Sequence, residues 1–146
     1  MTQPRPCRAL AAAIAIALLA PAVPEAQQPE PKKPTIALRA TPPVGFTPMR
    51  VRASAELRDG SDDYADFYCA TVEWEWGDGT MSENSSDCDP YEAGKSVIQR
   101  RFAAEHTYRQ GGAYRIVFRL KQRSKVVGSA TATIQVRAGA GDGFGR

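Results

Sequence analysis

The segment from Trp74 to Thr80 (Trp-Glu-Trp-Gly-Asp-Gly-Thr) constrains the fold of this chain more than any other. Val72, Trp74 and Trp76 share one parity and polar residues take the other, which is the period of a β-strand with one apolar face. The strand must stop at Gly-Asp-Gly, because residues without a Cβ let the backbone turn sharply and an aspartate can bond the neighbouring main chain. The segment therefore predicts a strand with inward-facing tryptophans followed by a tight turn.

A second long alternation follows in the C-terminal half of the chain. Its apolar parity is Tyr114, Ile116, Phe118 and Leu120, against Arg115, Val117, Arg119 and Lys121. Two strands that each carry one aromatic-rich face bury those faces only if a second sheet covers them. The pattern therefore predicts an all-β chain built as a sheet packed on a sheet.

These residues resemble the PKD (polycystic kidney disease) domain family. The Trp74–Gly79 stretch is similar to the W-x-F-G-D-G hallmark, and the stretch from His106 to Leu120 is similar to the closing pattern H-x-Y-x-x-x-G-x-Y-x-V-x-L-x-V. The resemblance spans residues 35–137 and implies an immunoglobulin-like β-sandwich of about seven strands with an extracellular interaction or spacer role. It implies no ligand, because fold and function are separable. The motif residues are Trp74, Trp76, Gly77, Asp78, Gly79, His106, Tyr108, Gly112 and Tyr114.

Alternation predicts further strands at Thr35–Ala40, Met49–Leu57, Ser96–Ala103 and Ser129–Arg137. Within Met49–Leu57 the apolar parity is Val51, Ala53, Ala55 and Leu57. In Ser96–Ala103 the pattern is poor, and we place Val97, Arg101 and Ala103 on one face. The residues from Thr80 to Lys95 are polar and are predicted to be irregular.

The two ends of the chain have compositions unlike that of a folded domain. Residues 1–26 have the arginines, apolar run and small residues of a secretory signal peptide, with cleavage near residue 22 or 26. Residues 27–34 are a Pro-rich linker, and residues 138–146 are a Gly-rich tail that we expect to be disordered. The apolar run is too short for a membrane span, so we expect a secreted or periplasmic protein.

Three cysteines are present, and Cys7 precedes the apolar run, so it should leave with the signal. Cys69 and Cys88 remain, and in an oxidising compartment two such cysteines are predicted to form a disulfide. A metal site is the alternative, but the chain has no C-x-x-C pair and its only histidine lies in a structural motif.

Charge is divided between two regions of the chain. From Asp59 to Glu92 there are eleven acidic residues and no lysine or arginine, whereas from Lys95 to Arg137 there are ten basic residues and one acidic residue. We expect an acidic loop end and a basic sheet face. Export and the acidic block both argue against nucleic acid as a partner.

Several residues invite a chemical role. His106 lacks a nucleophile or a second imidazole at motif spacing, so we interpret it as structural, with its ring bonded to loop backbone and Tyr108 bonded across the corner. The sequence contains no G-x-S-x-G elbow, zinc motif or phosphate loop, and no catalytic residue or cofactor is predicted. Asp59, Asp62, Asp63 and Asp66 form a candidate calcium loop, with a solvated acidic loop as the alternative.

Two functions remain open at this point. The first is an exported, non-catalytic interaction or structural module that binds an extracytoplasmic protein or envelope component through sheet edges and the basic face. The alternative is a polysaccharide-binding accessory module that uses exposed loop aromatics, for which the candidates are Tyr64, Phe67, Tyr68 and Tyr91.

Overall fold

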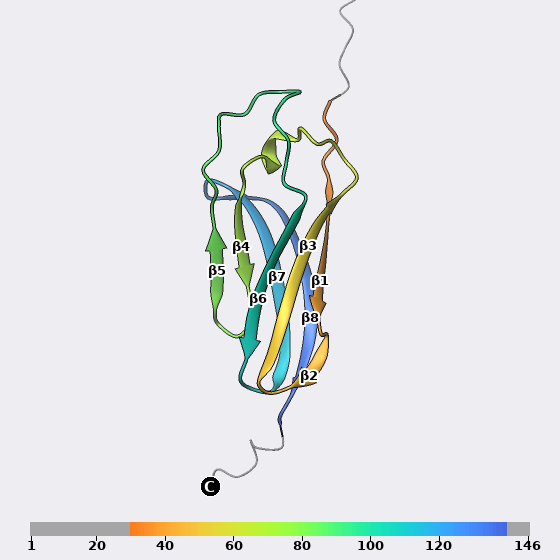
Figure 1. Ribbon diagram of the computed structural model, residues 1–146, viewed down its shortest axis with the longest axis vertical. Helices are drawn as coiled ribbons and strands as arrows, with labels where there is room; N and C mark the ends of the chain where they lie inside the picture. The colour runs from red at the N-terminus through yellow and green to blue at the C-terminus, as the bar shows by residue number, and fades with distance from the viewer. Residues whose placement is uncertain (1–29, 140–146) are drawn as a thin grey trace, which may run out of the picture.

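The computed structural model describes residues 30–139 and shows two β-sheets packed face to face (Figure 1). The elements are β1 (Thr35–Thr41), β2 (Val44–Phe46), β3 (Met49–Arg58), the 3-10 turn η1 (Ala65–Phe67), β4 (Thr71–Glu75), β5 (Met81–Asn84), β6 (Arg101–Tyr108), β7 (Gly112–Gln122) and β8 (Lys125–Arg137). One sheet has the strand order β1-β3-β6 and the other β2-β8-β7-β4-β5. Every pairing is antiparallel except that of β2 with β8. The fold is an immunoglobulin-like β-sandwich.

The core lies between the sheets and is formed by the alternating residues of each strand. In β3 the inward residues Val51, Ala53, Ala55 and Leu57 are at most 3% exposed, and in β7 Ile116, Phe118 and Leu120 are fully buried. Full burial of such a side chain contributes about 1.5–3 kcal/mol, so these two strands account for much of the stability. The apolar faces predicted for the central strands are confirmed.

The predicted strand at Ser96–Ala103 is wrong in both position and facing. The strand is Arg101–Tyr108, and its inward residues are the even-numbered Phe102, Ala104, His106 and Tyr108, whereas Arg101 and Ala103 are exposed. Before the strand, Ile98 is buried and donates its N–H to Asp62 O at 2.8 Å, and Val97 is 67% exposed. The backbone around Ile98 therefore bonds to the 59–62 loop and not to a neighbouring strand. The local alternation of residue types does not reveal this contact.

Two short strands were not predicted. β5 has four exposed residues, Met-Ser-Glu-Asn, and so carries no apolar alternation, although its pairing with β4 is regular. β2 has three residues and pairs in parallel with the end of β8. Each of these two strands forms because it pairs with the open edge of a neighbouring strand, and its own sequence carries no strand pattern.

The ends of the domain reach slightly beyond the predicted boundary. Lys32, within the predicted linker, exchanges hydrogen bonds of 2.8 Å with Ser61, and Pro34 is buried. The predicted signal peptide, residues 27–29 of the predicted linker and residues 140–146 of the predicted tail lie outside the described residues. Within residues 30–139, no helix has the length and apolar character needed to cross a membrane.

Candidate functional site

The turn after β4 joins the two sheets at one corner of the sandwich. Trp76 N–H donates to Thr80 O at 3.1 Å, which closes the turn. Gly77 adopts φ +83°, and a Cβ there would lie 2.6 Å from Arg115 O, so no other residue fits without displacing the backbone. Asp78 Oδ1 accepts hydrogen bonds from Thr80 N–H at 3.0 Å and from Thr80 Oγ1 at 2.5 Å. The Gly-Asp-Gly segment is therefore fixed from both sides.

His106 and Tyr108 on β6 complete this corner. His106 Nε2 lies 2.7 Å from Asp78 Oδ2, and the ring stacks on Trp76 with centroids 4.8 Å apart. The Tyr108 hydroxyl donates to Trp76 O at 2.8 Å in a fully buried position. The histidine ring thus binds the Asp78 carboxylate, not loop backbone as we expected, because the turn directs that carboxylate toward β6.

The surroundings of this corner favour an ionised Asp78 carboxylate and a neutral Tyr108 hydroxyl. Burial opposes ionisation of Asp78, but the hydrogen bonds from Thr80 and His106 outweigh it and lower the pKa of this carboxyl. Burial, together with the nearby Asp78 charge, raises the pKa of Tyr108. Thr80 Oγ1 and Asp78 both face the same nitrogen of His106, whereas a catalytic triad places nucleophile and acid on opposite ring nitrogens. The geometry at this corner is that of a structural clasp.

Tryptophan stacking with a ligand is ruled out by burial. Trp74 is 4% and Trp76 1% exposed, and their rings stack on each other with centroids 5.9 Å apart. The indole N–H of Trp76 donates to Ser82 Oγ on β5 at 2.9 Å. Both side chains belong to the core.

The proposed surface aromatics behave differently from one another. Phe67 is buried at 2% exposure, so its assignment to an exposed aromatic surface is wrong; η1 turns its ring into the core, where Tyr64 packs edge-on against it at 5.1 Å. Tyr68 and Tyr91 face each other at 5.6 Å, and their hydroxyls donate to Asp89 O and Asp63 O, respectively. These rings join the loops to each other and form no flat platform.

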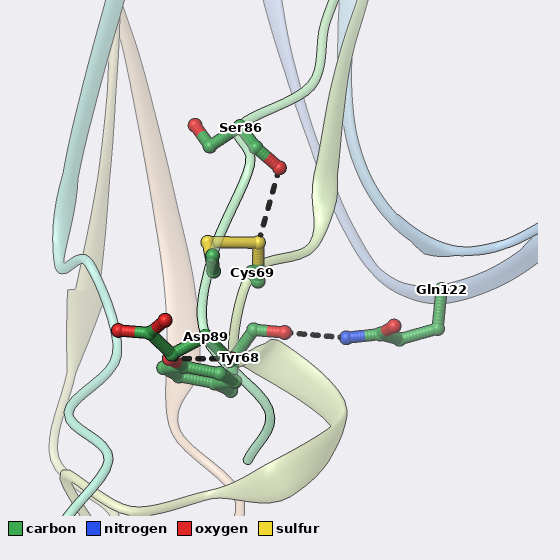
Figure 2. Close-up of a disulfide and its surroundings, with 6 residues drawn as sticks. Tyr68, Cys69, Ser86, Asp89 and Gln122 are labelled. Atoms are coloured by element: carbon green, nitrogen blue, oxygen red, sulfur yellow. Dashed lines mark hydrogen bonds between the residues drawn. A yellow bond between two sulfur atoms is a disulfide. The ribbon is translucent and has the colours of Figure 1, made fainter.

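Cys69 and Cys88 are joined by a disulfide that tethers the long loop after β5 to the start of β4 (Figure 2). Cys69 Sγ lies 3.2 Å from Ser86 O, and Gln122 on β7 donates to Tyr68 O at 2.6 Å. The long loop is thus attached through the disulfide at Cys88 and through the Tyr68 hydroxyl, which donates to Asp89 O at 3.1 Å, while Gln122 holds Tyr68 itself in place. A disulfide is typical of proteins folded in oxidising compartments.

The side chain of Arg100 binds the acidic loop, a contact that the sequence did not indicate. Arg100 donates to the carbonyl oxygens of Leu57, Asp59 and Gly60 and binds Asp62 Oδ1 at 2.5 Å. No three His, Cys, Asp or Glu side chains in residues 30–139 lie close enough together to hold a metal ion. The guanidinium therefore occupies oxygens that a calcium ion would use. Calcium binding by Asp59, Asp62, Asp63 and Asp66 stays a prediction.

The charges on the outer face of the five-stranded sheet are neutralised by ion pairs within that face. Glu73 accepts from Lys121 and Arg119 at 2.9 Å each, Arg119 also binds Glu75, and Lys121 also binds Glu83. The hydrogen bond that Lys121 donates holds the pKa of Glu73 below its usual range, and the hydrogen bond that Arg119 donates to Glu75 raises the pKa of Arg119. The charges of Arg119 and Lys121, from the basic C-terminal half, are thus neutralised here by glutamates of the acidic middle segment.

The outer face of the three-stranded sheet, in contrast, carries an excess of positive charge. We call it the arginine face. Its arginines come mainly from β1 and β3, and its two acids are Glu56 and Glu105. The arginines are Arg39, Arg50, Arg52, Arg58 and Arg101. Five positive charges against two negative ones leave an excess of three, and within the described residues Arg39 has no carboxylate partner.

Small residues hollow the middle of the arginine face. Ala37, Ser54 and Ala103 lie on neighbouring strands and line a depression of ≈ 360 Å³ whose rim includes Arg39, Arg52, Arg58 and Arg101. Glu56 binds Arg58 at 3.0 Å and Arg101 at 3.8 Å, and these groups are strongly exposed. Exposed ion pairs of this kind contribute only about 0–1 kcal/mol, so the arginines are available to another anion. The Arg50 and Arg52 alternation within β3 was a sequence signal for this face.

The scan against protein-family models and the search of curated proteins found no match. The chain is similar in structure to a PKD domain of an M14-like peptidase from the Thermoplasmatales archaeon SCGC AB-540-F20, with a TM-score of 0.48 and 15% sequence identity. The match covers 72% of this chain and 97% of that chain.

Proposed function

We propose that this protein is an exported, non-catalytic binding module whose arginine face binds an acidic partner in the extracytoplasmic space, a protein or an envelope component. The observation that carries the proposal is the excess of three positive charges around a hollow of small residues. The Cys69–Cys88 disulfide and the signal-like N-terminus support the location.

The chemistry of the face suits carboxylates. Guanidinium groups bind carboxylates through two parallel hydrogen bonds, and the strand geometry places residues i and i+2 of β3 about 6.6–6.8 Å apart. Arg50 and Arg52 are 74% and 64% exposed and share Glu105. An incoming row of carboxylates would compete with Glu56 and Glu105 for guanidiniums that are already oriented across the sheet.

The loop-aromatic alternative has less support. It depended on a surface of four rings, and Phe67 is in the core while Tyr68 and Tyr91 bind loop carbonyls. A glycan platform needs a flat exposed ring, and Tyr91, at 37%, is the most exposed of these four side chains. We therefore place the binding surface on the arginine face.

Charge reversal tests the proposal. A variant with Arg39, Arg52 and Arg101 changed to Glu is compared with a control in which Arg115, Arg123 and Arg137, exposed residues of the β7–β8 hairpin, are changed to Glu. Both variants change net charge equally. Retention on immobilised polyglutamate should fall at least about tenfold for the arginine-face variant alone, and it should weaken as salt increases.

Equal losses in the two variants would show that net charge, not the arginine face, drives retention, and would contradict the proposal. Duplex DNA is a second probe, and binding of DNA more tightly than polyglutamate would contradict our exclusion of nucleic acid. Retention on insoluble neutral glycans that survives arginine-face reversal would favour the aromatic alternative.

A further inference from the structure

The sandwich is open along one side, between the edge strands of its two sheets. β6 is the last strand of the three-stranded sheet and β5 the last of the five-stranded sheet, and they lie on the same side of the molecule (Figure 1). Residues of both strands line one hollow of ≈ 360 Å³, among them Ser82 and Asn84 from β5 and Phe102 and Ala104 from β6. The loop that links the strands runs above this side and adds no third strand between them.

The free edge of β6 carries unpaired backbone groups. Leu57 N–H donates to Arg100 O at 2.8 Å, which fixes the phase of the β3–β6 ladder. Because opposed residues in an antiparallel pair alternate between bonded and non-bonded, the odd-numbered residues of β6 direct their N–H and C=O away from β3. Arg101 O is bonded by Gln99 Nε2 at 2.8 Å. In the part of the chain that the structure describes, no strand pairs with Ala103 and Glu105 on this side.

The two sides of this edge differ in chemistry. The hollow beneath it is lined by Trp74, Phe102 and Val97 together with polar residues of β5, so apolar inward side chains of an added strand would find apolar contacts on part of the lining. On the outer side Arg101, 87% exposed, continues the arginine face. A strand placed here would therefore present apolar and acidic side chains in alternation, because successive side chains point to opposite faces.

The hollow also limits the length of an added strand. The Asp78–His106 clasp joins the turn after β4 to β6 at one end, and the Cys69–Cys88 disulfide lies at the other. The accessible edge is Arg101–Glu105. This length suits four to six residues of extended chain, on the basis of about 3.3 Å per residue.

We propose that the free edge of β6 binds an extended segment of a partner protein as a fourth strand of the three-stranded sheet, with apolar side chains in the hollow and acidic ones beside Arg101. The inference rests on the proposed function, since it takes the acidic partner to be a polypeptide. Strand addition uses main-chain hydrogen bonds for affinity and alternate side chains for specificity.

The experiment uses a fluorescent six-residue peptide that alternates valine with glutamate. Controls are a peptide of the same composition with its valines grouped, and the alternating peptide with its edge-facing amides N-methylated. Anisotropy with the wild-type protein should show at least about tenfold weaker binding of the N-methylated peptide, since methylation removes the backbone donors that would bond to β6. Equal binding of the alternating and N-methylated peptides would overturn the inference, and this comparison needs no variant.

A backbone variant provides the second arm. Ala103→Pro removes an N–H that points away from β3 and so leaves the β3–β6 ladder in place, whereas Ala103→Thr keeps the N–H and is the matched control. We expect Ala103→Pro to lower peptide affinity about tenfold and Ala103→Thr to change it less than threefold, with circular dichroism as the check of folding.

Polyglutamate retention separates this inference from the proposed function. If the wild-type protein retains polyglutamate and binds the alternating peptide at least about tenfold more tightly than the N-methylated peptide, both stand. If wild-type protein retains polyglutamate but binds alternating and grouped peptides equally, strand addition is overturned and the arginine face survives. If neither polyglutamate nor peptide binds, the proposed function itself fails.

Discussion

Replacing Tyr108 with Phe tests the clasp at a single hydrogen bond. Tyr108 is 1% exposed, and its hydroxyl donates to Trp76 O at 2.8 Å. Phe keeps the ring and its packing, so the change removes the hydroxyl alone and leaves a buried carbonyl without that donor. Leaving a buried polar group unsatisfied costs about 1–3 kcal/mol, and we expect the free energy of unfolding to fall by that amount.

Tyr114 offers a matched control on the neighbouring strand. Its hydroxyl donates to Gln110 O at 3.0 Å in an exposed position, and its ring packs against Tyr108 with centroids 4.4 Å apart. Water can replace this bond, so Tyr114→Phe should change stability by less than about 0.5 kcal/mol.

Urea unfolding followed by tryptophan fluorescence measures both variants. With a urea slope of about 2 kcal/mol/M, Tyr108→Phe should lower the midpoint by about 0.5–1.5 M at constant slope, and Tyr114→Phe should leave it nearly unchanged. Equal midpoints for the two variants would refute the reasoning, because the burial of the Tyr108–Trp76 bond would then contribute nothing.

Four further predictions concern the core, the charges, the disulfide and the acidic loop. Trp74→Ala should destabilise the domain by about 3–5 kcal/mol, measured by urea unfolding; an unchanged midpoint would place Trp74 at the surface. The lowered pKa of Glu73 means that the unfolded state binds more protons in acid, so stability should be complete above the unfolded pKa near 4.5 and decline as pH falls below it. Glu73→Gln should flatten this decline in pH-dependent melts, and an unaltered profile would contradict the role of Lys121 and Arg119. Reduction should lower stability by about 3 kcal/mol, because the Cys69–Cys88 bond closes a loop with a sequence separation of 19; two freely alkylating thiols in native protein would argue against the bond. Calcium at ten times its dissociation constant should raise stability by about 1.4 kcal/mol over EDTA if the Asp59–Asp66 loop binds it, and coincident melting curves in calcium, magnesium and EDTA would rule this out.

Much of the fold could be predicted because its central strands are amphipathic on a period of two. Val51 to Leu57 and Tyr114 to Leu120 place every second side chain in the core, and the observed burial follows that parity. The Gly-Asp-Gly turn was predictable because Gly77 has a backbone conformation that other residues rarely adopt.

The candidate binding surface was only partly predictable. A basic sheet face was expected from the C-terminal half, yet Arg119 and Lys121 are paired with Glu73, Glu75 and Glu83. The surplus lies on the other sheet, where β1 and β3 contribute most of the arginines. Which charges cancel depends on which strands are neighbours, and a count along the chain does not contain that information.

The sequence by itself determined the sandwich, the inward tryptophans and the turn that ends their strand, because strand periodicity and glycine conformations are local properties of the chain. Only the tertiary structure decided that β6 begins at Arg101, that Phe67 enters the core, and that Arg100 binds the carbonyl oxygens of the acidic loop. These features depend on contacts between residues tens of positions apart. Long-range packing selects them, and among the strands of residues 30–139 it also leaves the edge of β6 without a partner.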